Sequence, residues 1–478
     1  MTPRRVPAIL VVLAVLVGAA VVDREKSDPT VTTGAAQTAM AEAAPAGALS
    51  STWYCQGASA NKDGIANGTV IVANPTDRDV KGSVTFVANA DAKVPPKTVP
   101  LELKPWSRAG YSYADQLPAP WVAALVEVDG GGVVAEQSVS GPLGSDNAPC
   151  ANNASSTWYF ADGGTTRDAH LIYALANPFP EDAIVDLSFS TDQGRVVPQA
   201  LQGVVVPARG MLPVNVGEQV LRRRAVSATI RARTGRIVAA RIQTYDGSDR
   251  RKGLALVPAT PSPGDTWYFP EGYVTDGMTE RFQVYNPSGR EAHVTLALTL
   301  QQGAAEPFDI VVAPQGRFTV NVNDETRIPK NVGHAATVTV ERGPGVVVER
   351  SIDAAKPAPR LGLASTMGTR MTAARWAFAA GLAVKGVDEW VVMQNPGSSA
   401  VRVSFTALAS GQPLAIDKLQ GVPIPAHGRL AVRLGDFVQR DDLGLLLTAR
   451  GGSIVAERGI YRVGRIGMSL TNGIPLRD

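Results

Sequence analysis

The chain has 478 residues, of which 45% are apolar, and its 46 basic and 43 acidic side chains leave a net charge of +3. This near balance excludes the strongly basic character that is typical of nucleic-acid-binding proteins, and the apolar content is sufficient for folded cores. The length allows several domains.

An apolar segment opens the chain. Residues 6–22 are apolar or small, Arg4 and Arg5 precede them, and the charged run 23–26 ends them. As a helix this segment would span roughly 25 Å, slightly less than the ~30 Å core of a bilayer. Residues 1–26 are therefore predicted to be a signal anchor in the cytoplasmic membrane or, alternatively, a cleaved signal peptide of a secreted protein. In both cases the rest of the chain lies outside the cytoplasm.

Residues 27–50 are poor in large apolar side chains and rich in Ala, Thr and Pro. Such a composition lacks the apolar surface that a folded core needs, so we expect a disordered tether between the membrane and the folded part.

Four copies of one pattern follow the tether. A Trp opens an aromatic-Gly turn at intervals of 105, 109 and 109 residues, and an Asn-Pro pair follows each Trp after 19 to 21 residues. The Trp residues are Trp53, Trp158, Trp267 and Trp376, and the pairs begin at Asn74, Asn177, Asn286 and Asn395. A fixed period defines the number and size of domains. We assign repeat 1 to residues 51–151, repeat 2 to 152–263, repeat 3 to 264–372 and repeat 4 to 373–478.

The two cysteines, Cys55 and Cys150, lie near the start and the end of repeat 1. Export favours a disulfide between them, which in the chain-entropy model would stabilise the fold by on the order of 4 to 5 kcal/mol. Two free buried thiols are the alternative. A zinc site would need further ligands, and no His or other Cys lies nearby in the sequence.

Repeat 3 shows the strand pattern most clearly. Short β-rich runs, separated by Gly, Pro, Asn and Asp, occupy residues 267–269, 281–285, 292–300, 307–312, 317–322, 336–341 and 345–352. No amphipathic helix of three turns intervenes, so we predict about seven antiparallel strands per repeat. The fold class is all-β, a tandem array of four immunoglobulin-like sandwiches behind the N-terminal hydrophobic helix, with a small barrel as the alternative for each repeat. Short linkers predict an in-line array about 150 Å long.

The aromatic turns have two interpretations. Trp53, Trp158, Tyr159, Trp267, Tyr268 and Trp376 are candidates either for stacking on sugar rings or for structural packing. Trp and the following Gly persist in all four copies, but Tyr becomes Ala377 and the acid before the Gly becomes Ala380 in repeat 4. Persistence at every copy favours packing and a turn that requires Gly. The Asn of each Asn-Pro pair is expected to hydrogen-bond the turn backbone.

Residues 218–252 contain ten basic and three acidic side chains. In the alternating strand of this segment, Arg231 and Arg233 share the polar face, and we place Arg241 beside them across the hairpin. Such a face would attract phosphate or carboxylate polymers, or it is simply a solvated basic surface.

Catalytic and metal-binding patterns are absent from the sequence. The four histidines occupy non-equivalent places in the repeats and none has metal-ligand spacing, and no nucleophile elbow, phosphate-binding loop or calcium loop occurs. We therefore expect no enzymatic activity, no cofactor and no metal.

The runs Ser-Thr-Trp-Tyr at 51–54, Ser-Thr-Trp-Tyr-Phe-Ala-Asp-Gly at 156–163 and Thr-Trp-Tyr-Phe-Pro-Glu-Gly at 266–272, each with its Asn-Pro, resemble the actinobacterial domain of unknown function 5719 family. The copy at 376–381 departs from the motif. The resemblance implies a membrane-attached, extracytoplasmic protein whose genes tend to lie near glycosyltransferase and sugar-phosphate functions, and it implies no catalytic residues.

These observations predict a non-enzymatic, membrane-tethered, extracytoplasmic repeat protein that acts as a scaffold or interaction module in the bacterial cell envelope. The expected partners are the cytoplasmic membrane, through the N-terminal helix, and cell-wall polysaccharide or envelope proteins, but not nucleic acid. The alternative is a cell-wall glycan-binding β-sandwich array.

Overall fold

A computed structural model describes residues 41–300 and 305–477, most of which lie in β-strands. The predicted signal segment 1–26 and residues 27–40 of the predicted tether lie outside the described residues. Within the described ranges, no helix is long and apolar enough to cross a membrane.

The strands of repeat 1 are β1 (Ser51–Ala60), β2 (Asn67–Asn74), β3 (Val80–Ala88), β4 (Lys97–Leu103), β5 (Ser107–Ser112), β6 (Ala119–Val128), β7 (Val134–Gly141) and β8 (Gly144–Pro149). Those of repeat 2 are β9 (Thr157–Phe160), β10 (Ala169–Asn177), β11 (Ala183–Thr191), β12 (Gly194–Val196), β13 (Val204–Val206), β14 (Gly210–Asn215), β15 (Val226–Thr234), β16 (Val238–Asp246) and β17 (Lys252–Pro258).

The strands of repeat 3 are β18 (Thr266–Phe269), β19 (Met278–Tyr285), β20 (Ala292–Leu300), β21 (Phe308–Val312), β22 (Arg317–Asn321), β23 (His334–Arg342), β24 (Val347–Ala354) and β25 (Gly362–Met367). Those of repeat 4 are β26 (Arg375–Phe378), β27 (Val387–Gln394), β28 (Val401–Ala409), β29 (Gln412–Ala415), β30 (Val422–Ile424), β31 (Arg429–Arg433), β32 (Gly444–Arg450), β33 (Val455–Arg462), β34 (Met468–Asn472) and β35 (Ile474–Pro475).

Helices within the described residues are single turns. They are α2 (Tyr113–Gln116), η1 (Ala90–Ala92), η2 (Gln199–Leu201), η3 (Val216–Glu218), η4 (Val322–Asp324), η5 (Asp417–Leu419) and η6 (Leu434–Asp436).

Side-chain patterning separates two kinds of strand. In β20, every second side chain from Ala292 to Leu298 is buried, because a period of two places these residues on one face of the sheet. In β16, by contrast, all residues except the last are buried. A strand that is buried on both faces must be covered twice, once by its own repeat and once by another part of the molecule.

Each repeat forms two sheets that enclose one core. In repeat 3 the sheets have the orders β18-β23-β20-β21 and β22-β19-β24-β25. Trp267 and Val294 from the first sheet pack with Phe282 and Val348 from the second in a single buried cluster. Repeats 2 and 4 have the same layout, and in repeat 1 the two sheets are joined through a parallel contact of β1 with β2.

The strand pairing differs from that of an immunoglobulin domain. There the second strand lies between the first and the fifth, whereas in repeat 3 the second strand, β19, lies between the fifth and the seventh, β22 and β24. The repeats are therefore sandwiches with their own strand order.

The Asn of each Asn-Pro pair fixes the hairpin that follows it. In repeat 3, Asn286 Nδ2 donates to the carbonyls of Arg290 and Val312 at 2.6 and 3.1 Å, and its Oδ1 accepts from the Ser288 N–H at 3.0 Å. Asn74, Asn177 and Asn395 make the corresponding bonds. The expected role of this Asn in the turn is confirmed.

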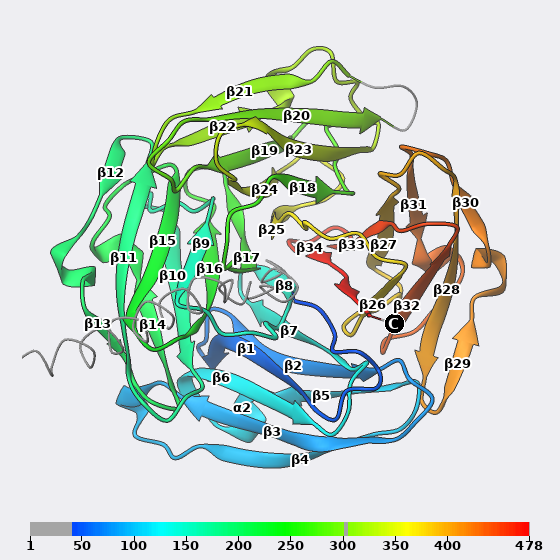
Figure 1. Cartoon of the computed structure of the whole chain (residues 1–478), viewed down its shortest axis with the longest axis horizontal. Helices are drawn as coiled ribbons and strands as arrows, with labels where there is room; N and C mark the ends of the chain where they lie inside the picture. The colour runs from blue at the N-terminus through cyan, green and yellow to red at the C-terminus, as the bar shows by residue number, and fades with distance from the viewer. Residues whose placement is uncertain (1–40, 301–304, 478) are drawn as a thin grey trace, which may run out of the picture. The chain divides into compact units, whose positions relative to one another are not determined.

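The four repeats form a closed ring (Figure 1). One strand of each repeat, namely β8, β17, β25 and β34, lies at a common axis, where each packs against the next and β34 packs against β8. The predicted in-line array is therefore wrong. Each repeat packs against its neighbour because the strand that precedes the axial strand, such as β16, is apolar on the face turned away from its own core. Burial of that face against the next repeat is favourable.

The two ends of the described chain close the ring. The Ala43 N–H donates to the Pro475 carbonyl at 3.0 Å, Ala43 forms a parallel bridge with Leu476, and Arg477 binds Glu42 with a shortest N···O distance of 2.5 Å. Glu42 and Ala43 are buried. This part of the predicted tether is therefore ordered against the C-terminal segment, so the prediction of disorder is wrong for residues 42 and 43.

Candidate functional site

The Trp of every aromatic turn is inside its repeat. Trp53, Trp158, Trp267 and Trp376 are at most 3% exposed. The indole N–H of the last three donates to a backbone carbonyl at 2.8 to 3.0 Å, that of Ile237, Val346 and Ile454 respectively. Tyr159 and Tyr268 are half-buried. The ring faces of these Trp residues are therefore not available to a glycan, and the packing interpretation accounts for the motif.

The Gly of the turn is required by close approach. A Cβ atom at Gly272 would lie 2.4 Å from the His334 ring, and one at Gly381 would lie 2.4 Å from the Leu443 carbonyl oxygen. Neither neighbour leaves room for a side chain, which explains why the position stays Gly even in the divergent fourth copy.

Cys55 and Cys150 form a disulfide, as the sequence predicts. Cys55 lies in β1 and Cys150 directly follows β8, so the bond joins the first strand of repeat 1 to the end of its axial strand. Both residues are buried.

The predicted basic face is only partly present. Arg231 and Arg233 are exposed on β15, opposite the buried Ala228 and Ile230, as expected. Arg241 is not beside them. It lies on β16 in the other sheet of repeat 2 and is completely buried. The prediction failed because the chain after Arg233 crosses to the second sheet instead of returning along the same one.

Arg241 is one of three buried arginines that bind the next repeat in the ring. Its Nη1 lies 2.8 Å from Glu349 of repeat 3. Arg350 of repeat 3 binds Glu457 of repeat 4, and Arg458 of repeat 4 binds Glu136 of repeat 1 at 2.8 Å. All six side chains are at most 1% exposed. Three of the four interfaces between repeats therefore contain the same fully buried ion pair.

The glutamate of each pair also binds the aromatic turn of the preceding repeat. Glu349 Oε1 accepts from the N–H groups of Ala161 and Asp162 at 2.7 and 3.2 Å, just after Phe160. Glu457 accepts from the Glu271 N–H at 2.9 Å, and Glu136 accepts from Ala379 and Ala380 at 3.1 and 3.0 Å. The aromatic turn, which carries the family resemblance, thus binds a carboxylate of the neighbouring repeat through its backbone N–H groups.

A second arginine reinforces each charged interface. The three residues, Arg317, Arg429 and Arg108, occupy equivalent positions. Each pairs across the sheet with the residue that directly precedes the Asn of an Asn-Pro pair. Arg317 Nε donates to the Ser227 hydroxyl at 3.1 Å, Arg429 binds Glu271 at 2.5 Å, and Arg108 donates to the Ala379 carbonyl at 3.1 Å. Each reaches back to the repeat before it.

The interface between repeats 1 and 2 lacks all of these charges. Gln137 stands where the other repeats have the paired Arg, Ala240 replaces the Glu, and Met211 replaces the second Arg. Gln137 bonds its own repeat, donating to the Gly57 carbonyl at 2.9 Å and accepting from the Tyr113 hydroxyl at 3.1 Å. Ala240 instead packs in the core cluster of repeat 1.

Burial and charge act in opposition on the acids of the turns. Burial raises the pKa of the Asp162 carboxyl, but Arg241, Arg251 and Arg317 together hold it below its usual value. Burial likewise opposes the charge on Glu271, and Arg429, Arg360 and Arg350 bring its pKa below the usual value. Both carboxylates therefore stay ionised inside the interfaces.

A different acid lies at the ring axis. Asp146 on β8 is fully buried and accepts from the N–H groups of Leu256 on β17 and Asn147 at 2.7 and 2.8 Å. Burial raises the pKa of this carboxyl to about 8, because those hydrogen bonds offset only part of the loss of hydration. Around the axis, a cavity lined by Asn147, Leu256, Ser365 and Asn472 measures only about 10 Å³, room for about one water.

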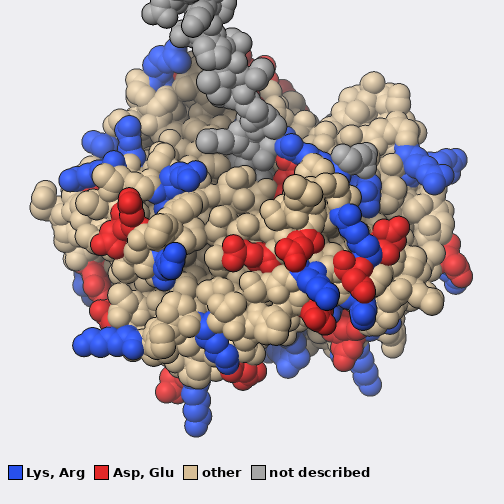
Figure 2. Space-filling view, turned by 60° about the horizontal axis from the view of Figure 1, so that its bottom comes forward, with Lys and Arg blue, Asp and Glu red and all other residues tan. Residues whose placement is uncertain are grey.

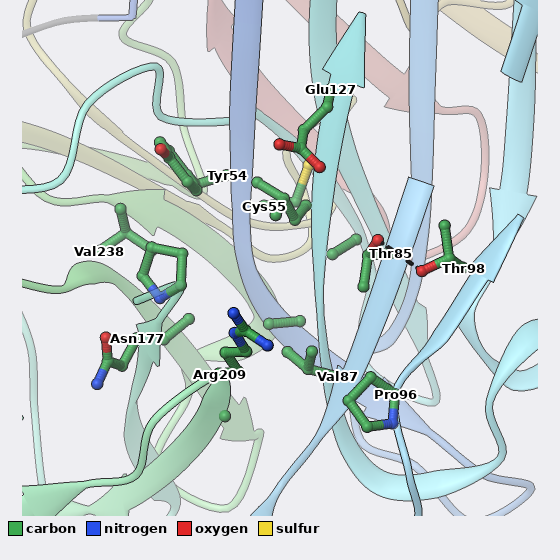
Figure 3. Close-up of a pocket in the computed structure, with 16 residues that line it drawn as sticks. Tyr54, Cys55, Thr85, Val87, Pro96, Thr98, Glu127, Asn177, Arg209 and Val238 are labelled. Carbon is green, nitrogen blue, oxygen red and sulfur yellow. Dashed lines mark hydrogen bonds between the residues drawn. The ribbon is translucent and has the colours of Figure 1, made fainter. Parts of the chain in front are cut away.

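Two larger hollows lie at interfaces. The 1–2 pocket, of about 440 Å³, is lined mainly by small and apolar side chains of repeats 1 and 2, with Glu127 and Arg209 as its charged groups. Figure 3 shows Tyr54, Thr85 and Val87 on the side of repeat 1, facing Asn177, Arg209 and Val238 of repeat 2.

The 2–3 cleft, of about 890 Å³, is polar. Six cationic side chains and four carboxylates line it, namely Arg224, Arg250, Arg251, Arg281, Arg317, Lys356, Asp162, Asp168, Asp249 and Asp353. A volume of this size is within the range of small-molecule sites in proteins. Among the described residues, no group of three or more His, Cys, Asp or Glu side chains is arranged to hold a metal ion.

Comparison with known proteins supports the family resemblance. Residues 129–322 match the DUF5719 family model, described as a family of unknown function. The match extends from the hairpin after β6 to the first residue of η4 and includes all of repeat 2. The sequence matches none of the curated proteins with which it was compared.

Several solved structures have weak similarity to this chain. The crystal structure of Thermotoga maritima 1070 is 19% identical and covers 22% of this chain and 94% of its own, with a TM-score of 0.20. The Anabaena sensory rhodopsin transducer is 21% identical and covers 18% of this chain and 80% of its own, with a TM-score of 0.17. A Streptomyces avermitilis alpha-L-rhamnosidase complexed with L-rhamnose is 11% identical over 67% of this chain and 44% of its own, with a TM-score of 0.16. These scores are too low to carry an argument about function.

The buried ion pairs are the functional feature that sequence reasoning missed. A signal for them exists, because Val-Ala-Glu-Gln, Val-Ala-Ala-Arg, Val-Val-Glu-Arg and Val-Ala-Glu-Arg recur in register at 134–137, 238–241, 347–350 and 455–458. Every repeat has at least one charged residue at this place inside an apolar strand, and such a charge indicates a buried partner. The partner of each charged residue cannot be identified from the sequence of one repeat, because it lies in a neighbouring repeat.

Proposed function

We propose that this chain is a non-enzymatic interaction module of the bacterial cell envelope, located outside the cytoplasm and tethered to the cytoplasmic membrane through residues 1–26. The observation that carries the proposal is how its buried ionisable groups are used. Glu136, Glu349 and Glu457 are the kind of buried carboxylate that acid–base catalysis employs. Each is instead engaged by an Arg and by backbone N–H groups of the preceding repeat.

The location outside the cytoplasm is supported by the Cys55–Cys150 disulfide, because such bonds form and persist in oxidising compartments. The two described chain ends meet at Ala43 and Leu476, at the interface of repeats 4 and 1. The described chain therefore both begins and ends at this interface.

The surface suits a module that contacts several partners. On the face shown in Figure 2, acidic and basic side chains are interspersed over the molecule. Such a surface favours solubility and specific polar contacts over bulk attraction to one polymer. We propose envelope proteins or cell-wall polysaccharide as partners. The alternative of a glycan-binding array loses its stacking Trp residues, which are buried.

In-cell crosslinking of the full chain, followed by mass spectrometry of the envelope fraction, tests this proposal. We expect a reproducible set of envelope partners that is lost in Arg458→Met, which disturbs the ring, and kept in Arg450→Met, an exposed arginine of the same repeat. A capture profile equal to that of an unrelated exported protein would contradict the interaction role. Turnover of any substrate by the purified chain would contradict the non-enzymatic role.

A further inference from the structure

The 2–3 cleft is open because two aromatic side chains are missing from it. At the 3–4 interface, Tyr461 stands four residues after the paired Glu, and Trp390 stands five residues before the Asn-Pro pair. Arg360 lies between them, with its Cζ 3.5 Å from the centre of the Tyr461 ring and 5.8 Å from that of Trp390. These three side chains occupy the space that corresponds to the cleft.

At the 2–3 interface the equivalent positions carry charged side chains in place of the two aromatic rings. Asp353 replaces Tyr461 and Arg281 replaces Trp390, while Arg251 takes the place of Arg360. Arg251 stacks on Tyr245 of its own repeat at 3.9 Å, and both Arg251 and Arg281 contact the one carboxylate of Asp353. Two guanidinium groups therefore share a single counter-charge at the wall of the cleft.

The rim adds cations that are free. Arg224, Arg250 and Lys356 are exposed, and within the described residues none of them has an ion-pair partner. Deeper in the cleft, Arg317 donates to the Ser227 hydroxyl and has no carboxylate within ion-pair distance in this same part of the structure. The uncommitted groups of the cleft are thus mainly donors with positive charge, which bind phosphate or carboxylate oxygens.

The carboxylates complement these donors. Asp249 and Asp168 also line the cleft, and carboxylate oxygens accept hydrogen bonds from hydroxyl groups. We propose that the 2–3 cleft is a binding site for an anionic sugar, in which Arg250, Arg317 and Lys356 bind the phosphate or carboxylate group and Asp249 and Asp168 accept from the sugar hydroxyls. The proposal goes beyond the role as an interaction module and does not depend on it.

Calorimetric titration of the purified full chain measures this binding directly. The probes are glucose 6-phosphate, glucuronate, inorganic phosphate and neutral glucose. We expect saturable binding of at least one charged sugar, weaker binding of inorganic phosphate and none of glucose. Affinity should fall as salt is raised, since exposed charges are screened over about 10 Å at 0.1 M ionic strength. A preference for glucose 6-phosphate or for glucuronate identifies the anionic group.

Two variants locate the site. Arg250→Ser with Lys356→Ser should weaken binding by at least about tenfold, because it removes two free rim charges. The matched control is Arg231→Ser with Arg233→Ser, two exposed arginines on β15 of repeat 2 that do not line the cleft, and this variant should bind as the wild type does.

A third variant copies the filled interface. Asp353→Tyr with Arg281→Trp reproduces the side chains of the 3–4 interface, so it should fill the cleft and abolish binding while the thermal unfolding transition remains cooperative. Absence of binding by every charged sugar would overturn the proposal. Equal loss of affinity in the control variant, or binding unchanged in both cleft variants, would also overturn it, since the ligand would then lie elsewhere.

Discussion

The interfaces 4–1 and 1–2 solve the same packing problem with different chemistry. At 4–1, Arg458 and Glu136 form a fully buried pair and Arg108 adds a second contact. At 1–2, the corresponding residues are Gln137, Ala240 and Met211, and the contact is mainly apolar. Both interfaces close around the axis, so the charged pair is not needed for the ring to form. A buried pair often contributes little net stability over a well-packed apolar replacement, but it penalises the loss of either partner.

The largest effect should follow from removing one member of a buried pair. Arg458→Met leaves Glu136 buried without a counter-ion at the interface that the chain does not span covalently. We expect a loss of about 3 to 5 kcal/mol in the free energy of unfolding, measured by chemical denaturation. Arg450→Met, at an exposed site of the same repeat, should change it little. Equal midpoints for the two variants would show that the pair at 4–1 is energetically neutral.

Removing the disulfide tests whether repeat 1, which borders the uncharged interface, relies on covalent support. Cys55→Ser with Cys150→Ser should lower the free energy of unfolding by about 2 to 5 kcal/mol, because the unfolded chain regains the freedom of a long loop. The measurement is denaturant unfolding with and without reductant. Wild type in reductant should match the variant, and an unchanged variant would mean that the apolar contacts of the 1–2 interface suffice.

A pH titration tests the contribution of the buried acid at the axis. The folded-state pKa of Asp146, about 8, is above its unfolded value of 3.8, so its contribution to stability is full below pH 3.8 and declines as pH rises to 8. At 1.36 kcal/mol per unit, the free energy of unfolding should fall by about 2 kcal/mol between pH 6 and pH 8. Glu389, whose pKa burial raises to about 7, contributes with the same sign.

Asp146→Asn cannot titrate, so it should reduce this slope, whereas the exposed Asp63→Asn should retain it. Thermal unfolding at a series of pH values gives the comparison. A slope that is identical in the two variants would place the pH dependence elsewhere in the ring.

The smallest effect is expected when one interface is converted into the other. Arg458→Gln with Glu136→Ala reproduces Gln137 and Ala240 at the 4–1 interface. The double variant should lie within about 1 kcal/mol of the wild type, because both members of the buried pair are removed together. A double variant as unstable as Arg458→Met alone would mean that the apolar surface around Ala240, and not the absence of charge, stabilises the 1–2 interface.

The sequence predicts local structure well in this protein. Every strand expected in repeat 3 is present, and β20 has the predicted bounds, because its alternation of apolar and polar side chains is set by its own sheet. The Trp, Gly and Asn positions are also readable, since each acts within one repeat. The disulfide followed from two cysteines and the inference of export.

Ring closure and the candidate site were not predictable in the same way. They depend on contacts between residues more than a hundred positions apart, such as Arg241 with Glu349. Arg241 also shows the limit of hairpin reasoning, because the chain between β15 and β16 changes sheets. The 2–3 cleft could be recognised from the sequence only by comparing equivalent positions, such as Asp353 and Tyr461. That comparison requires the knowledge that both residues face an interface.

The ion pairs at the interfaces restrict where repeats 1 and 2 can stand in the ring. In repeat 1, Glu136 faces the preceding repeat in the ring, and Gln137 stands at the position that in other repeats pairs with the following repeat. Repeat 1 therefore needs a repeat with the buried Arg before it and a repeat without the buried Glu after it. Repeat 2, with Ala240 and Arg241, has the opposite requirement. If repeats 1 and 2 were exchanged, Arg458 would face Ala240 and Glu349 would face Gln137, leaving two buried charges unpaired. The charged interfaces therefore disfavour an exchange of repeats 1 and 2, whereas repeats 3 and 4, which both carry the Glu and the Arg, would form the same pairs in either order.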